Sequence, residues 1–402
     1  MTTGRGGGMR GTVWAAANQL GVVAGTPAEL RSALLSGAAT AGSRLVLPGA
    51  DPAAVTELAA VMDEFGHGPV RIDTPPGGAA PGAVDPSDAV SVCSADPQRV
   101  TLAYEESEHD HGGLRTAWLR AGQALVREQE PAARALCLLA ALPARAEPGV
   151  RTALDRLAEA APWSVGEVRE DVGPVVAATV FAGRMLVADR GGTVHGLDAA
   201  RPVAVATGAR IRAVAALPDT TVLLLDERGR LRTHGPGSAL TAAVQATLAA
   251  HPGTALAVSR GAVVVGDRTG SVHAFGAAGL HQAALHCGRV TALAAADGDG
   301  PPAVLSGGAD GSVRRWRPGR RASGTTVAER PCPVVALHAA ATADGTAFAV
   351  AWADGLVELH RPGRGRAPLG FRPGPAVRAV ALTPDDALAV GTDETLCVLR
   401  PR

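Results

Sequence analysis

The segment Leu305-Ser-Gly-Gly-Ala-Asp310-Gly311-Ser-Val-Arg-Arg-Trp316 decides the fold class of the C-terminal part of the chain. Its Asp310-Gly311 pair separates two apolar runs. Asp-Gly in that setting is a strong signal for a tight β-hairpin, because such turns need positive φ. Comparable turns recur at Gly192, Gly229, Gly270, Asp354-Gly355 and Thr392-Asp393-Glu394. The segment is therefore one copy of a repeat of roughly 40 residues.

Short apolar runs surround each of these turns. Ala262-Val-Val-Val precedes one turn directly, and Val377-Arg-Ala-Val-Ala-Leu lies further upstream of another. Short Val-rich runs that are bounded by turn residues are typical of buried strands. Four short strands in about 40 residues are the period of a β-propeller. The sequence predicts an all-β propeller of six blades over residues 163–402.

The repeat resembles the WD40 family in the segment Leu305–Trp316, which has the turn Asp and a Trp in the expected third strand. Pro384-Asp385 resembles the turn after a WD40 first strand. The resemblance implies a hydrogen-bonded Asp-His-Ser/Thr-Trp tetrad in each blade. However, the Gly-His dipeptide of the family is missing from all six repeats, and Trp316 is the only Trp at its position. We therefore expect the tetrad to be absent or incomplete.

The last repeat contains only three apparent strands before the chain stops. The segment Trp163-Ser-Val-Gly-Glu-Val168 directly precedes the first repeat and has the pattern of a strand. A fourth strand from this segment would close the ring and hide two sheet edges that otherwise invite aggregation. We expect this velcro closure.

The region before the propeller alternates strand and helix patterns, which predicts a small α/β unit followed by a helical segment. No family is recognised there. The expected parts are a disordered tail at 1–10, with no clear helix after the Gly-rich run 4–8, an α/β unit at 11–73, a Pro/Gly/Ala-rich linker at 74–88, a strand pair at 89–92 and 100–103, and three helices at 113–128, 131–142 and 148–160.

Composition excludes several chemistries. All 38 basic residues are Arg, so a P-loop lysine and a lysine Schiff base are excluded. Five scattered cysteines without a CxxC pair indicate free thiols in a reducing compartment. With no apolar run long enough for a membrane helix and no signal peptide, a cytoplasmic bacterial protein is expected.

One polar cluster is a candidate metal site. Glu108, His109 and His111 place two imidazoles and a carboxylate close together in sequence, and such groups can ligate a divalent metal. The alternative is a solvated acidic segment that complements the dipole of the helix beginning near Gly113. No other cofactor is expected.

A run of arginines is a candidate partner-binding rim for phosphate or an acidic protein. Its members are Arg314, Arg315, Arg317, Arg320, Arg321, Arg364 and Arg366. Solvated loops are the alternative, and the lack of interleaved aromatics argues against nucleic acid. The histidines His195, His234, His273 and His360 near the third strands are interpreted as repeat drift.

A propeller holds rigid loops around a central channel, and its function resides in those loops. Without a catalytic constellation in the sequence, the first hypothesis is a non-catalytic, monomeric interaction scaffold that binds protein partners. The alternative is an enzyme that uses the channel or a metal near His109 and His111.

Overall fold

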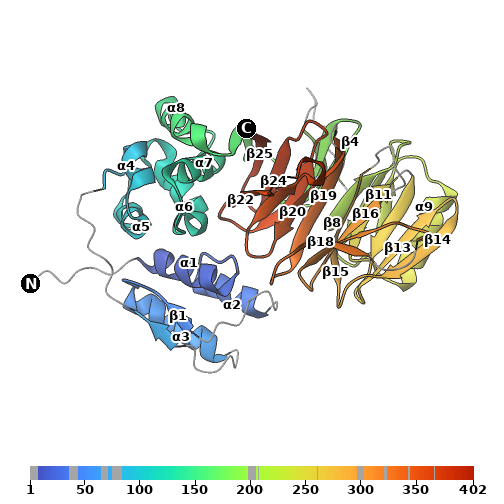
Figure 1. Ribbon diagram of the computed structural model, residues 1–402, viewed down its shortest axis with the longest axis horizontal. Coiled ribbons are helices and arrows are strands. Elements are labelled where there is room, and N and C mark those ends of the chain that lie inside the picture. The colour runs from blue at the N-terminus through green and yellow to red at the C-terminus, as the bar shows by residue number, and fades with distance from the viewer. Residues whose placement is uncertain are drawn as a thin grey trace, which may run out of the picture.

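The computed structural model describes residues 8–35, 44–64, 71–74, 84–197, 205–206, 208–259, 261–296, 303–320, 324–342, 345–365 and 367–402. Helices of the N-terminal part lie beside a C-terminal body built of strands (Figure 1). None of the described helices is long and apolar enough to cross a membrane.

The C-terminal body is a propeller of six antiparallel sheets, as the sequence predicts. Blade 1 contains β4 (Val175–Phe181), β5 (Arg184–Asp189), β6 (Thr193–Gly196) and β7 (Val205–Ala206); blade 2 contains β8 (Ile211–Ala216), β9 (Val222–Asp226) and β10 (Leu231–His234); blade 3 contains β11 (Ala255–Ser259), β12 (Ala262–Gly266), β13 (Ser271–Gly276) and β14 (Gly279–Ala284). Blade 4 contains β15 (Val290–Ala296), β16 (Ala303–Gly308), β17 (Ser312–Trp316) and β18 (Thr325–Glu329); blade 5 contains β19 (Val334–Thr342), β20 (Gly345–Trp352), β21 (Val357–His360) and β22 (Leu369–Phe371); blade 6 contains β23 (Val377–Leu382), β24 (Leu388–Thr392), β25 (Leu396–Pro401) and β3 (Trp163–Arg169).

The predicted velcro closure is confirmed in blade 6. Strand β3 pairs antiparallel with β25, with Val168 opposite Cys397 and Val165 opposite Leu399. Trp163 at the start of β3 is fully buried, and its indole N–H donates to the Gly370 carbonyl at 3.0 Å. The first strand of the region therefore joins the last blade to the fifth and removes the open edge.

Blade 2 departs from the expected four strands, because three strands of it are described and the chain then forms helix α9 (Ala239–Ala250). Ser238 and Thr241 cap the start of this helix reciprocally, and the segment is rich in Ala, the strongest helix former. Val244 and Leu248 are buried against the apolar cluster between blades 2 and 3. The helix thus covers blade 2 without breaking the ring.

The turns between second and third strands all lie on one face of the propeller, which we call the turn face. Their glycines have positive φ; they are Gly192, Gly229, Gly270, Gly311 and Gly355. Because neighbouring strands run antiparallel, the connection into each innermost strand reaches the same face.

The N-terminal part begins with α1 (Met9–Leu20), α2 (Pro27–Leu35), β1 (Arg44–Val46), α3 (Pro52–Glu64) and β2 (Arg71–Asp73), with β1 and β2 parallel. The expected tail at 1–10 is wrong at its end, because Met9 and Arg10 belong to α1; residues 1–7 and most of the expected linker lie outside the described residues. Helix α1 forms because Val13, Trp14 and Leu20 bury one face.

The strand pair expected at 89–92 and 100–103 is also wrong, because both segments are helices. Helix α4 (Ala89–Ser94) begins at Asp88, whose carboxylate accepts from the backbone N–H groups of Val90 and Ser91. Helix α5 (Pro97–Glu106) begins in the same way at Asp96, with Pro97 at its first position. These caps satisfy orphan N–H groups and outweigh the β preference of short Val-containing runs. Helices α6 (Leu114–Leu125), α7 (Pro131–Ala141) and α8 (Pro148–Leu157) follow.

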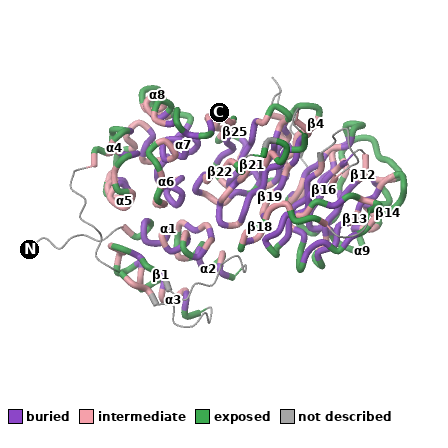
Figure 2. The backbone as a smooth tube through the Cα atoms, viewed as in Figure 1, coloured by how far each residue is buried: buried purple, intermediate pink, exposed green. Residues whose placement is uncertain are grey.

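The helical layer packs against blades 5 and 6. One apolar cluster contains buried residues of α4–α8 and of these blades, and buried segments lie on both sides of the contact (Figure 2). Gly374, which precedes β23, has φ +101°, and a Cβ there would lie 2.5 Å from Ala121 Cα in α6. Arg120 of α6 bonds Glu394 of the blade 6 turn at 2.8 Å. The helices therefore cover the turn face over blades 5 and 6.

Candidate functional site

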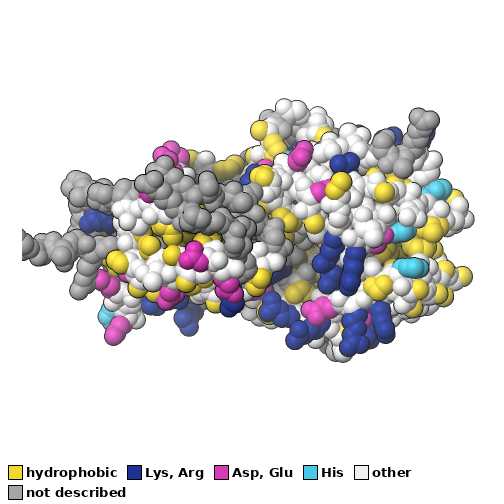
Figure 3. All heavy atoms as spheres, turned by 90° about the horizontal axis from the view of Figure 1, so that it is seen from below, with side chains coloured by type: hydrophobic (Ala, Val, Ile, Leu, Met, Phe, Trp, Pro, Cys, Tyr) yellow, Lys and Arg dark blue, Asp and Glu magenta, His cyan; other side chains and the backbone are white. Residues whose placement is uncertain are grey.

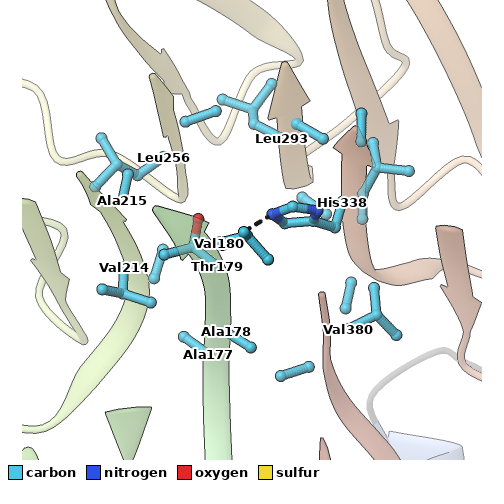
Figure 4. Close-up of a pocket in the computed structure, with 18 of the residues that line it drawn as sticks. Ala177, Ala178, Thr179, Val180, Val214, Ala215, Leu256, Leu293, His338 and Val380 are labelled. Carbon is cyan, nitrogen blue, oxygen red and sulfur yellow. Dashed lines mark hydrogen bonds between the residues drawn. The ribbon is translucent and has the colours of Figure 1, made fainter. Parts of the chain in front are cut away.

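The innermost strands of the six blades enclose a central channel with a volume of about 470 Å³. Its wall is built mainly of Ala, Val and Leu side chains, and Ala177, Val214, Leu256, Leu293 and Val380 face one another around it (Figure 4). Small apolar side chains leave the channel open but offer few groups for chemistry.

His338 of β19 is the one titratable side chain on the described channel wall apart from two arginines at a mouth. The backbone N–H groups of Val180 and Leu382 point at its two ring nitrogens, at 3.3 and 3.1 Å (Figure 4). Burial lowers the pKa of His338 to about 4, so the ring is neutral at pH 7. A neutral imidazole accepts a hydrogen bond at only one of its nitrogens, and through that bond His338 links blade 5 to a strand of another blade. No carboxylate or second imidazole lies beside His338 on the described channel wall.

Blade 4 contains a Ser-His-Asp arrangement. His286 Nε2 lies 2.9 Å from Ser306 Oγ, and its Nδ1 lies 3.0 Å from Asp310 Oδ1. The side chain of His286 is fully buried, Ser306 is buried within β16, and neither borders the channel. A nucleophile needs access to substrate, so this arrangement holds the turn rather than catalyses a reaction.

The same arrangement agrees with the expectation that a tetrad of the WD40 kind is absent or incomplete, because in blade 4 it is incomplete. An imidazole is present, but His286 follows Leu285 instead of Gly, so a search for Gly-His misses it. Asp310, His286 and Ser306 are hydrogen-bonded, whereas the buried indole N–H of Trp316 has no partner in the described part of the chain. Burial is the first cause that lowers the pKa of His286. Three of the four tetrad positions are therefore joined.

Two of the histidines interpreted as repeat drift have a structural role. His195 Nε2 lies 3.0 Å from Asp189, and His273 Nε2 lies 2.9 Å from Asp267. Each Asp begins a turn and each His follows in the third strand, six residues later. Each pair closes its turn across one hairpin, so their recurrence reflects the repeat geometry.

The candidate metal ligands lie between α5 and α6. The rings of His109 and His111 meet edge-on with centroids 6.2 Å apart, and His111 Nε2 lies 2.8 Å from Ser107 Oγ. Asp110 accepts from the Thr116 backbone N–H at 2.9 Å. Within the described residues, no three His, Cys, Asp or Glu side chains are grouped to hold a metal ion. A site that uses Glu108, His109 and His111 stays a prediction.

Of the predicted arginine rim, Arg317 and Arg320 lie on the face opposite the turn face. Arg314 and Arg315 are in β17, and Arg317 and Arg320 follow in the connection to β18. Arg314 Nε donates to Ser312 Oγ at 3.3 Å, while Arg315, Arg317 and Arg320 are exposed. Arg321, Arg366 and the side chain of Arg364 lie outside the described residues. The role of this rim stays a prediction.

A different set of arginines, which sequence reasoning missed, meets at the channel mouth on the turn face. Arg212 and Arg378 line the mouth where β8 and β23 begin. Arg378 bonds Asp393 at 2.9 Å, and Asp393 also bonds Arg190 at 2.6 Å. Since the chain has no Lys, the dark blue side chains gathered on the propeller in Figure 3 are arginines. Single arginines in separate repeats give no local signal; only ring closure brings them together.

No family model matches the sequence, and no curated protein matches it. Among solved structures, the chain is similar to one described as "Streptogramin B lyase structure", with a TM-score of 0.43 and 9% identity over 60% of this chain and 98% of that chain. So distant a likeness assigns no activity to this chain.

Proposed function

We propose that the protein is a non-catalytic interaction scaffold that presents the turn face of its propeller to a protein partner. One observation carries the proposal: the N-terminal helices cover this face on one side only. In the open sector, blades 1–4, the turn residues Arg190, Arg228, Arg268 and Ala309 are exposed. In the covered sector, blades 5 and 6, Asp354 and Gly355 of the blade 5 turn are buried, and the exposed Glu394 of the blade 6 turn bonds Arg120 of α6.

The polar side chains of the described channel wall and blades favour a binding function over an enzymatic one. Apart from Arg212 and Arg378 at one mouth, His338 is the only titratable side chain on the described channel wall, and the Ser306-His286-Asp310 set is buried. Rigid exposed turns around a closed ring are suited to specific contact with a partner, because such turns lose little conformational entropy on binding.

The proposal is tested with the full chain and a pair of matched variants. Ala309→Trp places a bulky side chain on the exposed turn of blade 4, and Ala278→Trp places one on the exposed β13–β14 turn at the opposite end of blade 3. We expect a native lysate to yield a stoichiometric partner with the wild-type chain and with Ala278→Trp, and not with Ala309→Trp. Equal capture by both variants, or no specific protein in any capture, contradicts the proposal.

A further inference from the structure

Three arginines from three blades lie near one another on the turn face in the open sector, where Arg212 and Arg268 are close enough for their charges to act on Arg289. Arg212 enters β8 in blade 2, Arg268 is in the turn of blade 3, and Arg289 precedes β15 in blade 4. The Val290 N–H donates to the Asp267 carbonyl at 2.9 Å, which sets Arg268 and Arg289 at neighbouring positions. We call Arg212, Arg268 and Arg289 the arginine cluster.

The arginine cluster has no carboxylate partner among the described residues. Partial burial lowers the pKa of Arg289, and the charges of Arg212 and Arg268 lower it further, with no acidic group acting in the other direction. The nearest turn carboxylate, Asp267, already accepts from His273 and from the Thr269 and Ser271 N–H groups. Within the described part of the chain, the Arg212 guanidinium donates to the Glu227 carbonyl alone, at 3.4 Å.

This lack of neutralisation is local. Across the mouth, Asp393 holds both Arg190 and Arg378, and in blade 5 Asp354 holds both Arg330 and Arg372. At these two places one carboxylate neutralises two close arginines, while no such carboxylate is paired with the arginine cluster among the described residues. Like charges that are held together without a counterion cost free energy, unless a ligand supplies the missing charge.

We propose that the arginine cluster binds a dianionic oxyanion, namely a phosphoryl group carried by a partner protein. Three positive charges match two negative charges better than the single charge of a carboxylate. The planar guanidinium fork also fits phosphate oxygens with paired N–H donors. The inference rests on the proposed function for the exposure of the open sector to a partner. No aromatic side chain accompanies the cluster, so base stacking does not favour nucleic acid.

The test uses the full chain and small probes, so that it needs no partner. Inorganic phosphate and O-phosphoserine are titrated by calorimetry at constant ionic strength, with glutarate and chloride as comparisons. We expect both phosphoryl probes to bind at one site, and Arg289→Gln or Arg268→Gln to weaken binding at least about tenfold. The control Arg320→Gln, on the opposite face, should bind as the wild type does.

A second measurement separates binding from folding. Without phosphate, Arg289→Gln should melt at the same temperature as the wild type or slightly higher, because removal of one charge relieves repulsion. Unchanged phosphate affinity in Arg289→Gln overturns the site. Glutarate carries the same two negative charges on separate carboxylates, so glutarate binding as tight as phosphate overturns the selectivity for a phosphoryl group. An oligonucleotide that binds more tightly than phosphoserine overturns the protein partner. Phosphate can bind while Ala309→Trp still captures the partner, so this inference and the proposed function can fail separately.

Discussion

The covered and open sectors of the turn face have the same kind of turn but differ in whether a carboxylate pairs with the nearby arginines. In the covered sector, the Asp354 carboxylate bonds Arg330 at 2.6 Å and Arg372 at 2.8 Å, and the turn is buried. In the open sector, Thr269 stands at the position of Asp354, and the neighbouring Arg268 and Arg289 have no carboxylate among the described residues. In these two turns, the acidic residue before the glycine pairs the nearby arginines in one case, and its replacement by Thr leaves them without an ion pair within the described chain in the other. In blade 4, Asp310 stands at the same position but bonds His286 instead.

The largest effect is expected from loss of the covered carboxylate. Asp354→Ala leaves two partly buried guanidinium groups unpaired and should lower the free energy of unfolding by about 3 kcal/mol. Urea unfolding at pH 7 measures this. The control Asp385→Ala removes an exposed partner of Arg400, for which about 0–1 kcal/mol is expected. Equal losses in the two variants would show that Asp354 is not a structural ion pair.

Acid should remove the same contribution. Burial raises the pKa of Asp354, but hydrogen bonds and charge from Arg372 and Arg330 outweigh it and hold the pKa below its ordinary 3.8. The native state therefore binds this proton less readily than the unfolded chain. The stabilisation is complete above about pH 4 and is lost as the pH falls through the lower native pKa.

The next effect tests whether the turn of the open sector is as tightly built as that of the covered sector. Gly270 and Gly279 have nearly the same φ, +95° and +96°, but a Cβ at Gly270 would lie 2.0 Å from the His286 carbonyl oxygen, whereas a Cβ at Gly279 meets nothing within 4 Å. Gly270→Ala should therefore cost about 2 kcal/mol more than Gly279→Ala in thermal or urea unfolding. Equal losses of unfolding free energy in the two variants would mean that the turn of blade 3 can shift to accommodate the added Cβ.

The sequence predicted what is local and repeated. Turn glycines, Val-rich runs and the segment at Trp163 sufficed for six blades and their closure, because hairpin turns and strand periodicity act over a few residues. The segments of α4 and α5 resemble strands because they are short and contain Val. The signals for helix are the capping residues Asp88 and Asp96, which lie just before these segments. Helix α9 replaced an expected strand because its Ala-rich sequence favours helix.

The site was harder to predict because its residues are brought together by the ring. His286 reaches Ser306 and Asp310 from the connection that precedes their blade, so a dipeptide pattern could not show the contact. Arg212 and Arg289 are far apart in sequence and belong to different repeats. Residue pairs of this kind become visible only when the angular order of the blades is known.

A pH series should reveal a third contribution, which belongs to the channel that both sectors share. His338 titrates near its ordinary value of 6.5 in the unfolded chain and at about 4 when native. Its neutral form is favoured by folding, so its stabilisation is complete above about pH 6.5 and is lost as the pH falls toward 4. By pH 5, wild type should have lost roughly 1–2 kcal/mol that His338→Gln does not lose. Parallel losses in the two chains would assign the acid sensitivity elsewhere, with His286 as the next candidate.

The smallest effect concerns the border between the sectors, where Asp393 holds Arg190 and Arg378. Its side chain is 36% exposed and its partners are 53% and 46% exposed, so Asp393→Asn should change the free energy of unfolding by no more than about 1 kcal/mol. The substitution nevertheless adds one net positive charge at the channel mouth. Because the charge lies across the mouth and is screened at physiological salt, it should tighten phosphate binding at the arginine cluster by no more than about twofold. Calorimetry can detect this change, and weaker binding in Asp393→Asn would mean that Asp393 positions the cluster instead of opposing its charge.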